Sequence, residues 1–339
     1  MTAQIAGMGW VTPLGADLGT VWQRLAAGEV PETKVLTNPE TGALHRYLAV
    51  PPKLVDHLAR NPRLRRSSAI SYYAVAAGLA ALADAGVELN AAAAARTAVV
   101  FAVSDGGVIY TRKFYDQIVK QGANAASPLL FPETVYNAPA SHLAALLGID
   151  GASYTLVGDS SVGLAALHFG AQLLALGDID RCIVVGAEEC DWILCEAYKT
   201  WRMARAPLAE GAAAVVLSRE GPWNVHTHPG STFFHQREAQ AALEGVLADF
   251  ASEPPPDLVV SSANQTFVDR AERAALNIRH AETRTLFPKR QFGEAPGAGA
   301  LMQTVLAAVA LEKLELGSAL VPVIGFSQQT SAAQLTRTR

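Results

Sequence analysis

Charged residues are scarce in this chain of 339 residues. They make up 17% of the sequence, against roughly 25% in an average globular protein, while half of the residues are apolar. Much of the chain must therefore be buried in a core or a subunit interface, and disorder is excluded. Lys and Arg number 27 and Asp and Glu 31, so the net charge of -4 gives no electrostatic reason to expect nucleic acid or an anionic membrane as partner.

Cysteine and long apolar runs are also in short supply. Cys182, Cys190 and Cys195 contain no CxxC pair and lack a histidine at ligand spacing, so we expect packed thiols and neither a disulfide framework nor a metal site. The longest mostly apolar stretch, 69–83, falls short of the roughly 20 residues of a membrane span. The first residues, MTAQIAGMGWVTPLG, lack the pattern of a signal peptide, so we expect a first strand there and a cytoplasmic protein.

Short β-branched runs alternate with alanine-rich stretches along the chain, a pattern typical of an α/β fold with buried sheets. The predicted strands cover 4–7, 97–103, 154–157, 182–185, 213–217, 258–261 and 320–324. The predicted helices cover 19–27, 68–85, 138–147, 163–176, 237–250, 269–277 and 300–314.

Two segments, 154–186 and 284–325, share an order of elements: strand, polar turn, glycine, alanine-rich helix, LG loop, strand. This similarity indicates a duplication, with one half over 1–220 and the other over 221–339. Two such halves would pack their helices between two sheets and bring equivalent turns to a common central site. Ligand chemistry in these sheets gathers at the carboxyl ends of the strands.

The turn Gly158–Asp159–Ser160–Ser161–Val162–Gly163 follows a predicted buried strand and opens a helix. Backbone N–H groups and the positive end of the helix dipole suit a nucleophile at this place. Asp and Ser are also ordinary N-cap residues, so capping is the alternative interpretation.

Five further segments, with that turn, resemble the β-ketoacyl-ACP synthase family of the thiolase-like fold. They are IAGMGWVTPLGADLGTVWQRLAAG, PLAEGAAAVVLSRE, DRAERAAL, PKRQFGEAPGAGAL and GFSQQTSAAQL, in the family's order. The resemblance implies a duplicated five-layer αβαβα architecture. It also implies an acyl carrier protein as partner, its 4'-phosphopantetheine arm as part of the substrate, and no cofactor of the chain's own.

The family's reaction, as the resemblance implies it, needs a nucleophilic cysteine, two histidines and a glycine-rich terminal loop. Ser160 stands at the cysteine position and Glu294 at the second histidine. Counting back from Asp269 places Ser261 at the first histidine; a shift of one to three residues gives Ser262, Ala263 or Asn264. In the terminal loop Ser327 and Gln328 replace paired glycines, whereas Phe326 keeps the place of an aromatic gate.

These departures favour a non-catalytic subunit like the chain-length factors of type II polyketide and aryl-polyene pathways, which pairs with an active Cys-His-His synthase. The resemblance implies that the dimer contact falls on strand 154–157. The binding candidates are Asp159, Ser161, Asn264, Lys289 and Phe326. The alternative is a Ser160-dependent acyltransferase or acyl hydrolase with a carboxylate, Asp159 or Glu294, as its base. A free-standing scaffold or carrier-protein binder is the third possibility.

The residues that keep the family pattern are expected to act as scaffold. They are Lys289, Gly293, Gly297, Glu210, Gly211, Asp269 and Glu272. We expect the chain to be shortened in the loops that cover the acyl tunnel, notably between Thr200 and Leu208. The aromatic candidates for closing a tunnel are Phe101, Phe131 and Phe326.

Overall fold

The computed structural model describes residues 3–253 and 255–338 and has two halves with the same strand order. The strands of the first half are β1 (Gln4–Val11), β4 (Thr97–Val103), β5 (Ser153–Val157), β6 (Arg181–Glu188) and β8 (Gly211–Ser218). Those of the second are β9 (Trp223–Thr227), β11 (Leu258–Val260), β12 (Arg284–Leu286), β13 (Ser318–Ile324) and β14 (Gln329–Arg337), with the short β10 (Ser231–Thr232) beside β14.

The first half is ordered β1-β8-β6-β4-β5 and the second β9-β14-β13-β11-β12. Numbered within each half, both orders are 1-5-4-2-3. The directions also match, because β4 is parallel to β5 and β6 as β11 is parallel to β12 and β13. The predicted duplication is confirmed; the division at residue 220 stays a prediction.

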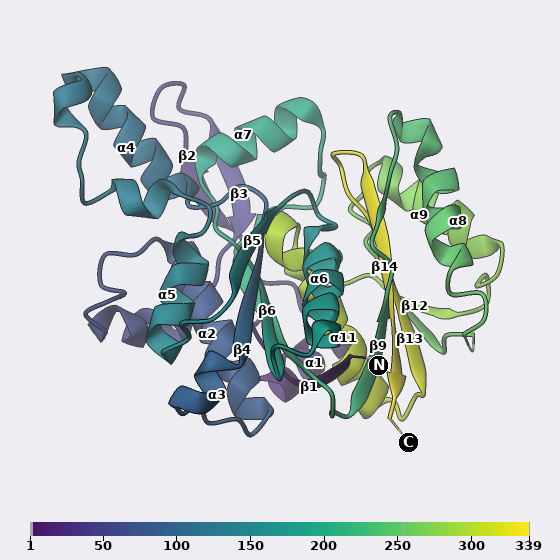
Figure 1. Cartoon of the computed structure of the whole chain (residues 1–339). Coiled ribbons are helices and arrows are strands. Elements are labelled where there is room, and N and C mark those ends of the chain that lie inside the picture. The colour runs from purple at the N-terminus through teal and green to yellow at the C-terminus, as the bar shows by residue number, and fades with distance from the viewer. Residues whose placement is uncertain (1–2, 254, 339) are drawn as a thin grey trace.

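Helices cover both faces of both halves. They are α1 (Leu18–Ala26), α2 (Ala69–Asp84), α3 (Ala91–Ala95), α4 (Val108–Gln121), α5 (Ala138–Leu147), α6 (Val162–Leu176), α7 (Trp192–Trp201), α8 (Ala239–Ala248), α9 (Phe267–Asn277), α10 (Lys289–Phe292) and α11 (Pro296–Lys313). Figure 1 shows α6 and α11 between the two halves, with α2 and α5 outside one and α8 and α9 outside the other. These are the predicted five layers.

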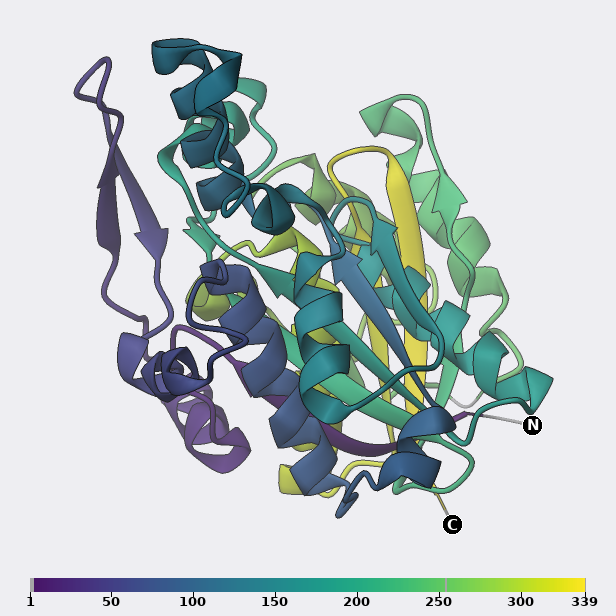
Figure 2. The ribbon, with the colours of Figure 1, turned by 60° about the vertical axis from the view of Figure 1, so that its left-hand side comes forward.

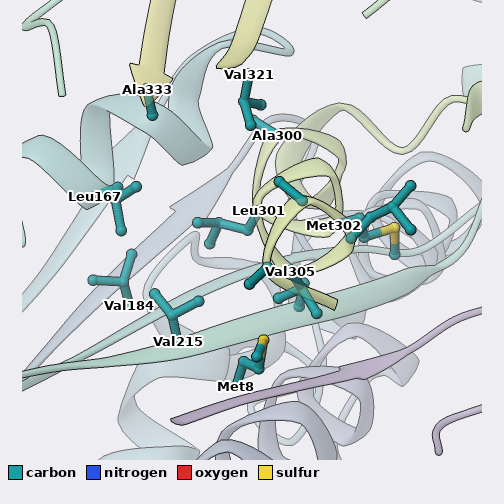
Figure 3. Packing of buried hydrophobic residues seen from close by; sticks show 14 of the residues in the cluster. Met8, Leu167, Val184, Val215, Ala300, Leu301, Met302, Val305, Val321 and Ala333 are labelled. Carbon is teal, nitrogen blue, oxygen red and sulfur yellow. The ribbon is translucent and has the colours of Figure 1, made fainter. Parts of the chain in front are cut away.

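The central helix α11 is apolar on all sides because both sheets enclose it, as a helix buried all round must be. Figure 3 shows Leu301 and Val305 between Val184 and Val215 of the first half and Val321 of the second. Where α6 and α11 approach, a Cβ on Gly163 would lie 3.0 Å from the Cβ of Ala300. Glycine there allows the two helices to start side by side.

Every predicted helix and strand is present, with ends moved by a few residues. The strand predicted over 258–261 ends at Val260, and the helix predicted from 300 begins at Pro296. The sequence pattern missed β14, which is rich in Ser, Thr and Gln; the ladders to β13 and β9 bury most of that strand. It also missed α4, which buries no residue, and α7.

A small sheet of β2 (Lys34–Thr37), β3 (Leu44–Leu48) and β7 (Leu208–Ala209) stands beside the main layers. Figure 2 shows the β2–β3 hairpin extending away from the body. The three cysteines are unpaired and buried, as predicted, and burial raises the pKa of the Cys195 thiol to about 11. In the described ranges, none of the helices combines the length and apolar character that a bilayer crossing requires.

Candidate functional site

Ser160 lies in the turn between β5 and α6 and is almost fully buried. Its neighbour Asp159 organises the turn, since Asp159 Oδ1 accepts hydrogen bonds from Ser161 N at 2.9 Å and Ser161 Oγ at 3.0 Å. The other oxygen, Oδ2, accepts one from Ser327 N at 3.0 Å, which ties the turn to the terminal loop. Burial raises the pKa of Asp159, and these hydrogen bonds oppose the rise.

The terminal loop approaches Asp159 too closely for any side chain at Gly325. A Cβ on Gly325 would lie 1.9 Å from Asp159 Oδ2. Asp159, one of the two predicted binding residues of the turn, therefore holds the turn against the terminal loop, while Ser161, the other, bonds to Asp159. Ser161 occupies the N-cap position of α6, but its side chain makes no hydrogen bond to the start of the helix, so it does not act as the capping residue that the alternative interpretation expected.

Glu294 is the centre of a buried polar network next to Ser160. Ser160 Oγ donates to Glu294 Oε1 at 3.2 Å. Lys289 Nζ donates to both carboxylate oxygens, at 2.8 and 2.9 Å, and Asn264 Nδ2 donates to Oε2 at 2.9 Å. All four side chains are buried. A carboxylate has about four acceptor positions, and these four hydrogen bonds occupy them.

The loop after β11 contributes Asn264 to this network, whereas Ser261 lies outside it. Ser261 Oγ donates to Glu272, the second carboxylate of α9, which also accepts from Ser262 N at 2.8 Å. Asn264 is fixed by Asp269 Oδ1, which accepts from Asn264 N at 2.9 Å. Of the residues considered for the first histidine position, Asn264 is thus the one whose side chain reaches Glu294, while Glu272 and Asp269 hold the loop.

The aromatic candidate Phe326 packs on Tyr198 of α7, with ring centroids 5.0 Å apart. Two residues after Phe326, Gln328 adopts φ +73°, the left-handed conformation that glycine favours. Its side chain Nε2 donates to the carbonyl of Phe234, and its own carbonyl accepts from Phe233 N at 3.0 Å. The loop therefore keeps a glycine-like backbone despite carrying Ser327 and Gln328.

Two carboxylates at this end of the sheet, the partly buried Asp105 and the buried Glu188, were missed from the sequence. Asp105 follows β4, which pairs with β5, and Glu188 ends β6, which pairs with the other side of β4, so both lie at the carboxyl ends of neighbouring parallel strands. Burial raises the pKa of Asp105 to about 6, against a hydrogen bond from Tyr198 Oη at 3.2 Å. Burial, and then Asp105, raise the pKa of Glu188, whose Oε2 accepts from Gly297 N at 2.9 Å. Their position directly after strand candidates was the signal available.

Three of the histidines contact residues outside the Glu294 network. His142 contacts Glu133 at 2.6 Å and His168 contacts Thr227 at 2.9 Å. His226 lies on β9 and contacts Glu253 at 3.2 Å. Among the residues that the structure describes, no group of three His, Cys, Asp or Glu side chains is placed to hold a metal ion. The site thus consists of a hydroxyl, a carboxylate, an ammonium and an amide, all buried and bonded to one another.

A cationic groove of about 630 Å³ lies beside α7 and the stretch 200–208. Arg46, Lys199, Arg202 and Arg205 line it. In the described part of the chain none of these four makes an ion pair. The backbone N–H of Arg205 donates to the carbonyl of Asn264 at 3.2 Å, so the groove adjoins the Glu294 network.

Comparison with known proteins gives one consistent result. The profile of the beta-ketoacyl synthase N-terminal domain matches residues 3–221. The 3-oxoacyl-[acyl-carrier-protein] synthase 2 of Vibrio cholerae is 26% identical over 186 residues, 55% of this chain and 45% of the relative. That of Coxiella burnetii is 26% identical over 217 residues, 62% of this chain and 48% of the relative. The chain thus matches about half the length of these relatives.

Solved structures agree over the whole chain. The ishigamide ketosynthase/chain length factor superposes with a TM-score of 0.83 at 19% identity, covering 100% of both chains. A ketosynthase in complex with its chain length factor from Xenorhabdus doucetiae gives a TM-score of 0.78 at 18% identity, covering 99% of this chain and 98% of that one. These matches confirm the thiolase-like fold, and the profile match over most of the chain shows that the protein belongs to the β-ketoacyl synthase family.

Proposed function

We propose that this chain is a non-catalytic, chain-length-factor-type subunit that pairs with an active ketosynthase in the cytoplasm. The pathway would be of the type II polyketide, aryl-polyene or fatty-acid-like class. The observation that carries the proposal is Glu294, which stands at a histidine position and is held by Lys289, Asn264 and Ser160. A malonyl unit losing CO₂ needs a hydrogen-bond donor for the enolate oxygen, and an anion there repels the enolate.

The same network opposes use of Ser160 as a nucleophile. A serine hydroxyl needs a neighbouring base, because the helix dipole alone is not enough to ionise an alcohol. Glu294 Oε1, which accepts from Ser160 Oγ, also accepts from Lys289 Nζ, so the carboxylate is already engaged by a cation and is not a free base for the hydroxyl. The network is therefore suited to holding loops together.

The surface that fits a partner is the free edge of β5, with its exposed apolar side chains. β5 ends the strand order of the first half, and Tyr154 and Val157 are 43% and 53% exposed. Tyr115 and Val119 of α4 and Phe131 of the following 3-10 helix are also exposed. An edge strand with uncovered apolar side chains is a ready surface for pairing with a second chain.

The cationic groove fits a second partner. Acyl carrier protein brings its substrate on a 4'-phosphopantetheine arm, and Arg and Lys side chains recognise phosphate groups. Arg46, Lys199, Arg202 and Arg205 lie where such an arm would approach the Glu294 network. The chain itself needs no cofactor in this proposal.

Co-expression with the Cys-His-His synthase of its own pathway tests the proposal. We expect the two proteins to co-purify, and the double variant Tyr154→Asp/Val157→Asp to abolish co-purification. Ile278→Asp is the matched control, because Ile278 is an equally exposed apolar residue at the end of α9. Two-carbon elongation of an acyl-carrier substrate by the isolated chain would overturn the proposal.

The second candidate is a Ser160-dependent acyltransferase or acyl hydrolase, favoured by the 3.2 Å hydrogen bond between Ser160 Oγ and Glu294. It predicts an acyl adduct after incubation with acyl-ACP or acyl-CoA, seen by intact mass and lost in Ser160→Ala. No adduct on the wild type, with a known acyl-enzyme as positive control, would exclude it.

A further inference from the structure

A second cavity lies at the far end of the sheet from β5, between α1, the edge strand β12 and the helices α10 and α11. Its volume is about 490 Å³, within the 300–1,000 Å³ typical of small-molecule sites. Because β5 and β12 end the strand order on opposite sides, pairing through β5 leaves this cavity open. It is separate from the Ser160 turn and plays no part in the proposed function.

The wall of the cavity is apolar and incompletely covered. Trp22 and Leu25 of α1, Leu286 of β12 and Leu314 after α11 all line it, and all are only partly buried where they pack on the core. Gln291 Nε2 donates to the carbonyl of Leu25 at 3.3 Å, which ties α10 to α1 and fixes the distance between the two sides. The cavity thus has a preformed wall of partly exposed apolar side chains.

The rim of the cavity is cationic. Arg284 and Arg290 both line it, and Arg290 lies over the ring of Phe287, 4.8 Å from the ring centroid. Within the described residues neither guanidinium makes an ion pair, and no Asp or Glu lines the cavity. A guanidinium presents its donors in a fork that matches a carboxylate.

We infer that this cavity binds an amphiphilic monocarboxylate, a fatty-acid-like molecule whose chain packs on Trp22 and whose carboxylate meets Arg284 and Arg290. The apolar wall supplies the burial that gives affinity, and the two cations select the charge. Since Arg290 and Gln291 belong to α10, which also carries Lys289, the bound molecule would contact the helix that holds Glu294.

Decanoate is the probe, and isothermal titration calorimetry on the full chain is the measurement. We expect decanoate to bind at least tenfold more tightly than decanol, which lacks the charge, and than acetate, which lacks the chain. The double variant Arg284→Gln/Arg290→Gln should weaken decanoate binding at least tenfold, and Trp22→Ala should do the same by removing apolar wall. Arg279→Gln, an arginine outside this cavity, is the matched charge control and should bind as the wild type does.

Equal affinity for decanoate and decanol would overturn the inference, as would unchanged binding in the double arginine variant. Equal weakening in Arg279→Gln would show a general charge effect and would overturn it too. Circular dichroism of each variant identifies a folding failure, in which case Arg290→Lys replaces the double variant: it keeps the charge and removes the fork. No change in decanoate affinity there would also contradict the assigned contact.

Discussion

Lys289 Nζ lies 2.8 and 2.9 Å from the two carboxylate oxygens of Glu294, and both side chains are buried. Lys289 begins the short helix α10, and Glu294 follows Gly293, which ends that helix and turns the chain with φ +77°. A buried pair of this kind is costly to form but more costly to break, because removing one partner leaves an unpaired charge away from water. It therefore fixes the loop that approaches Ser160.

Replacing Lys289 by Met should strongly destabilise the protein. Glu294 would keep only the donors Asn264 and Ser160, and we expect the free energy of unfolding to fall by about 3–5 kcal/mol. Urea denaturation followed by circular dichroism measures the change. The double variant Lys289→Met/Glu294→Leu should recover most of the loss, because it removes both charges together; a double variant as unstable as the single one would contradict this.

Glu210 should make stability depend on pH. Burial raises its pKa to about 7 from 4.5, while the hydrogen bond from Tyr73 opposes the rise. Since the folded state then binds the proton more tightly than the unfolded state, this group lowers the free energy of unfolding as pH rises from about 4.5 to about 7, and adds nothing further above that. The expected loss across this window is about 3 kcal/mol.

The measurement is the free energy of unfolding at several pH values for the wild type and for Glu210→Gln. Their difference isolates Glu210 from other buried carboxylates, and the variant should gain on the wild type as pH rises through the window. Glu88→Gln, at an exposed position, is the control and should run parallel to the wild type. A Glu210→Gln curve parallel to the wild type would show that burial does not shift this group.

The parts of the fold that were predictable from sequence are those whose pattern is local. The alternation of apolar strands and alanine-rich helices is complete over 154–186 and 284–325, so the duplication was visible without coordinates. β14 was not, because its polar residues are buried by ladders to β13 and β9, which are distant in sequence. Tertiary contact overrode local propensity there.

Some residues of the candidate site could likewise be predicted from sequence, and others could not. The positions of Ser160, Glu294 and Lys289 were readable from motif spacing, and the structure brings them together. The choice among Ser261, Ser262, Ala263 and Asn264 was not, because loop length alone does not say which side chain points inward. Glu272 decides it by binding the two serine hydroxyls, which leaves Asn264 to meet Glu294.

Glycine should be a more stable replacement for Gln328 than alanine. Its φ of +73° is strained for a residue with a Cβ, by about 1 kcal/mol, although its side chain is held by the Phe234 carbonyl. We expect Gln328→Gly to be more stable than Gln328→Ala by about 1 kcal/mol, because both lose the side-chain hydrogen bond and only glycine relieves the backbone. Thermal unfolding compares the two; equal melting temperatures would place the loop in a different conformation in solution.

A cysteine at position 160 should be unreactive for the reason that makes the site unsuited to the family's chemistry. In Ser160→Cys the thiol would lie beside the Glu294 carboxylate, and a neighbouring anion and burial both disfavour the thiolate, which is the reactive form. In Ser160→Cys/Glu294→Gln the neighbouring anion is gone while the Lys289 ammonium, which also bonds position 294, keeps its charge, so the thiolate is less disfavoured. We expect the double variant to react with iodoacetamide at least tenfold faster than Ser160→Cys at pH 7, as measured by intact mass over time.

The wild type sets the background from the buried Cys182, Cys190 and Cys195. If Ser160→Cys alone reacted as fast as the double variant, Glu294 would not be the group that suppresses nucleophilic chemistry here, and the absence of histidine alone would have to explain it.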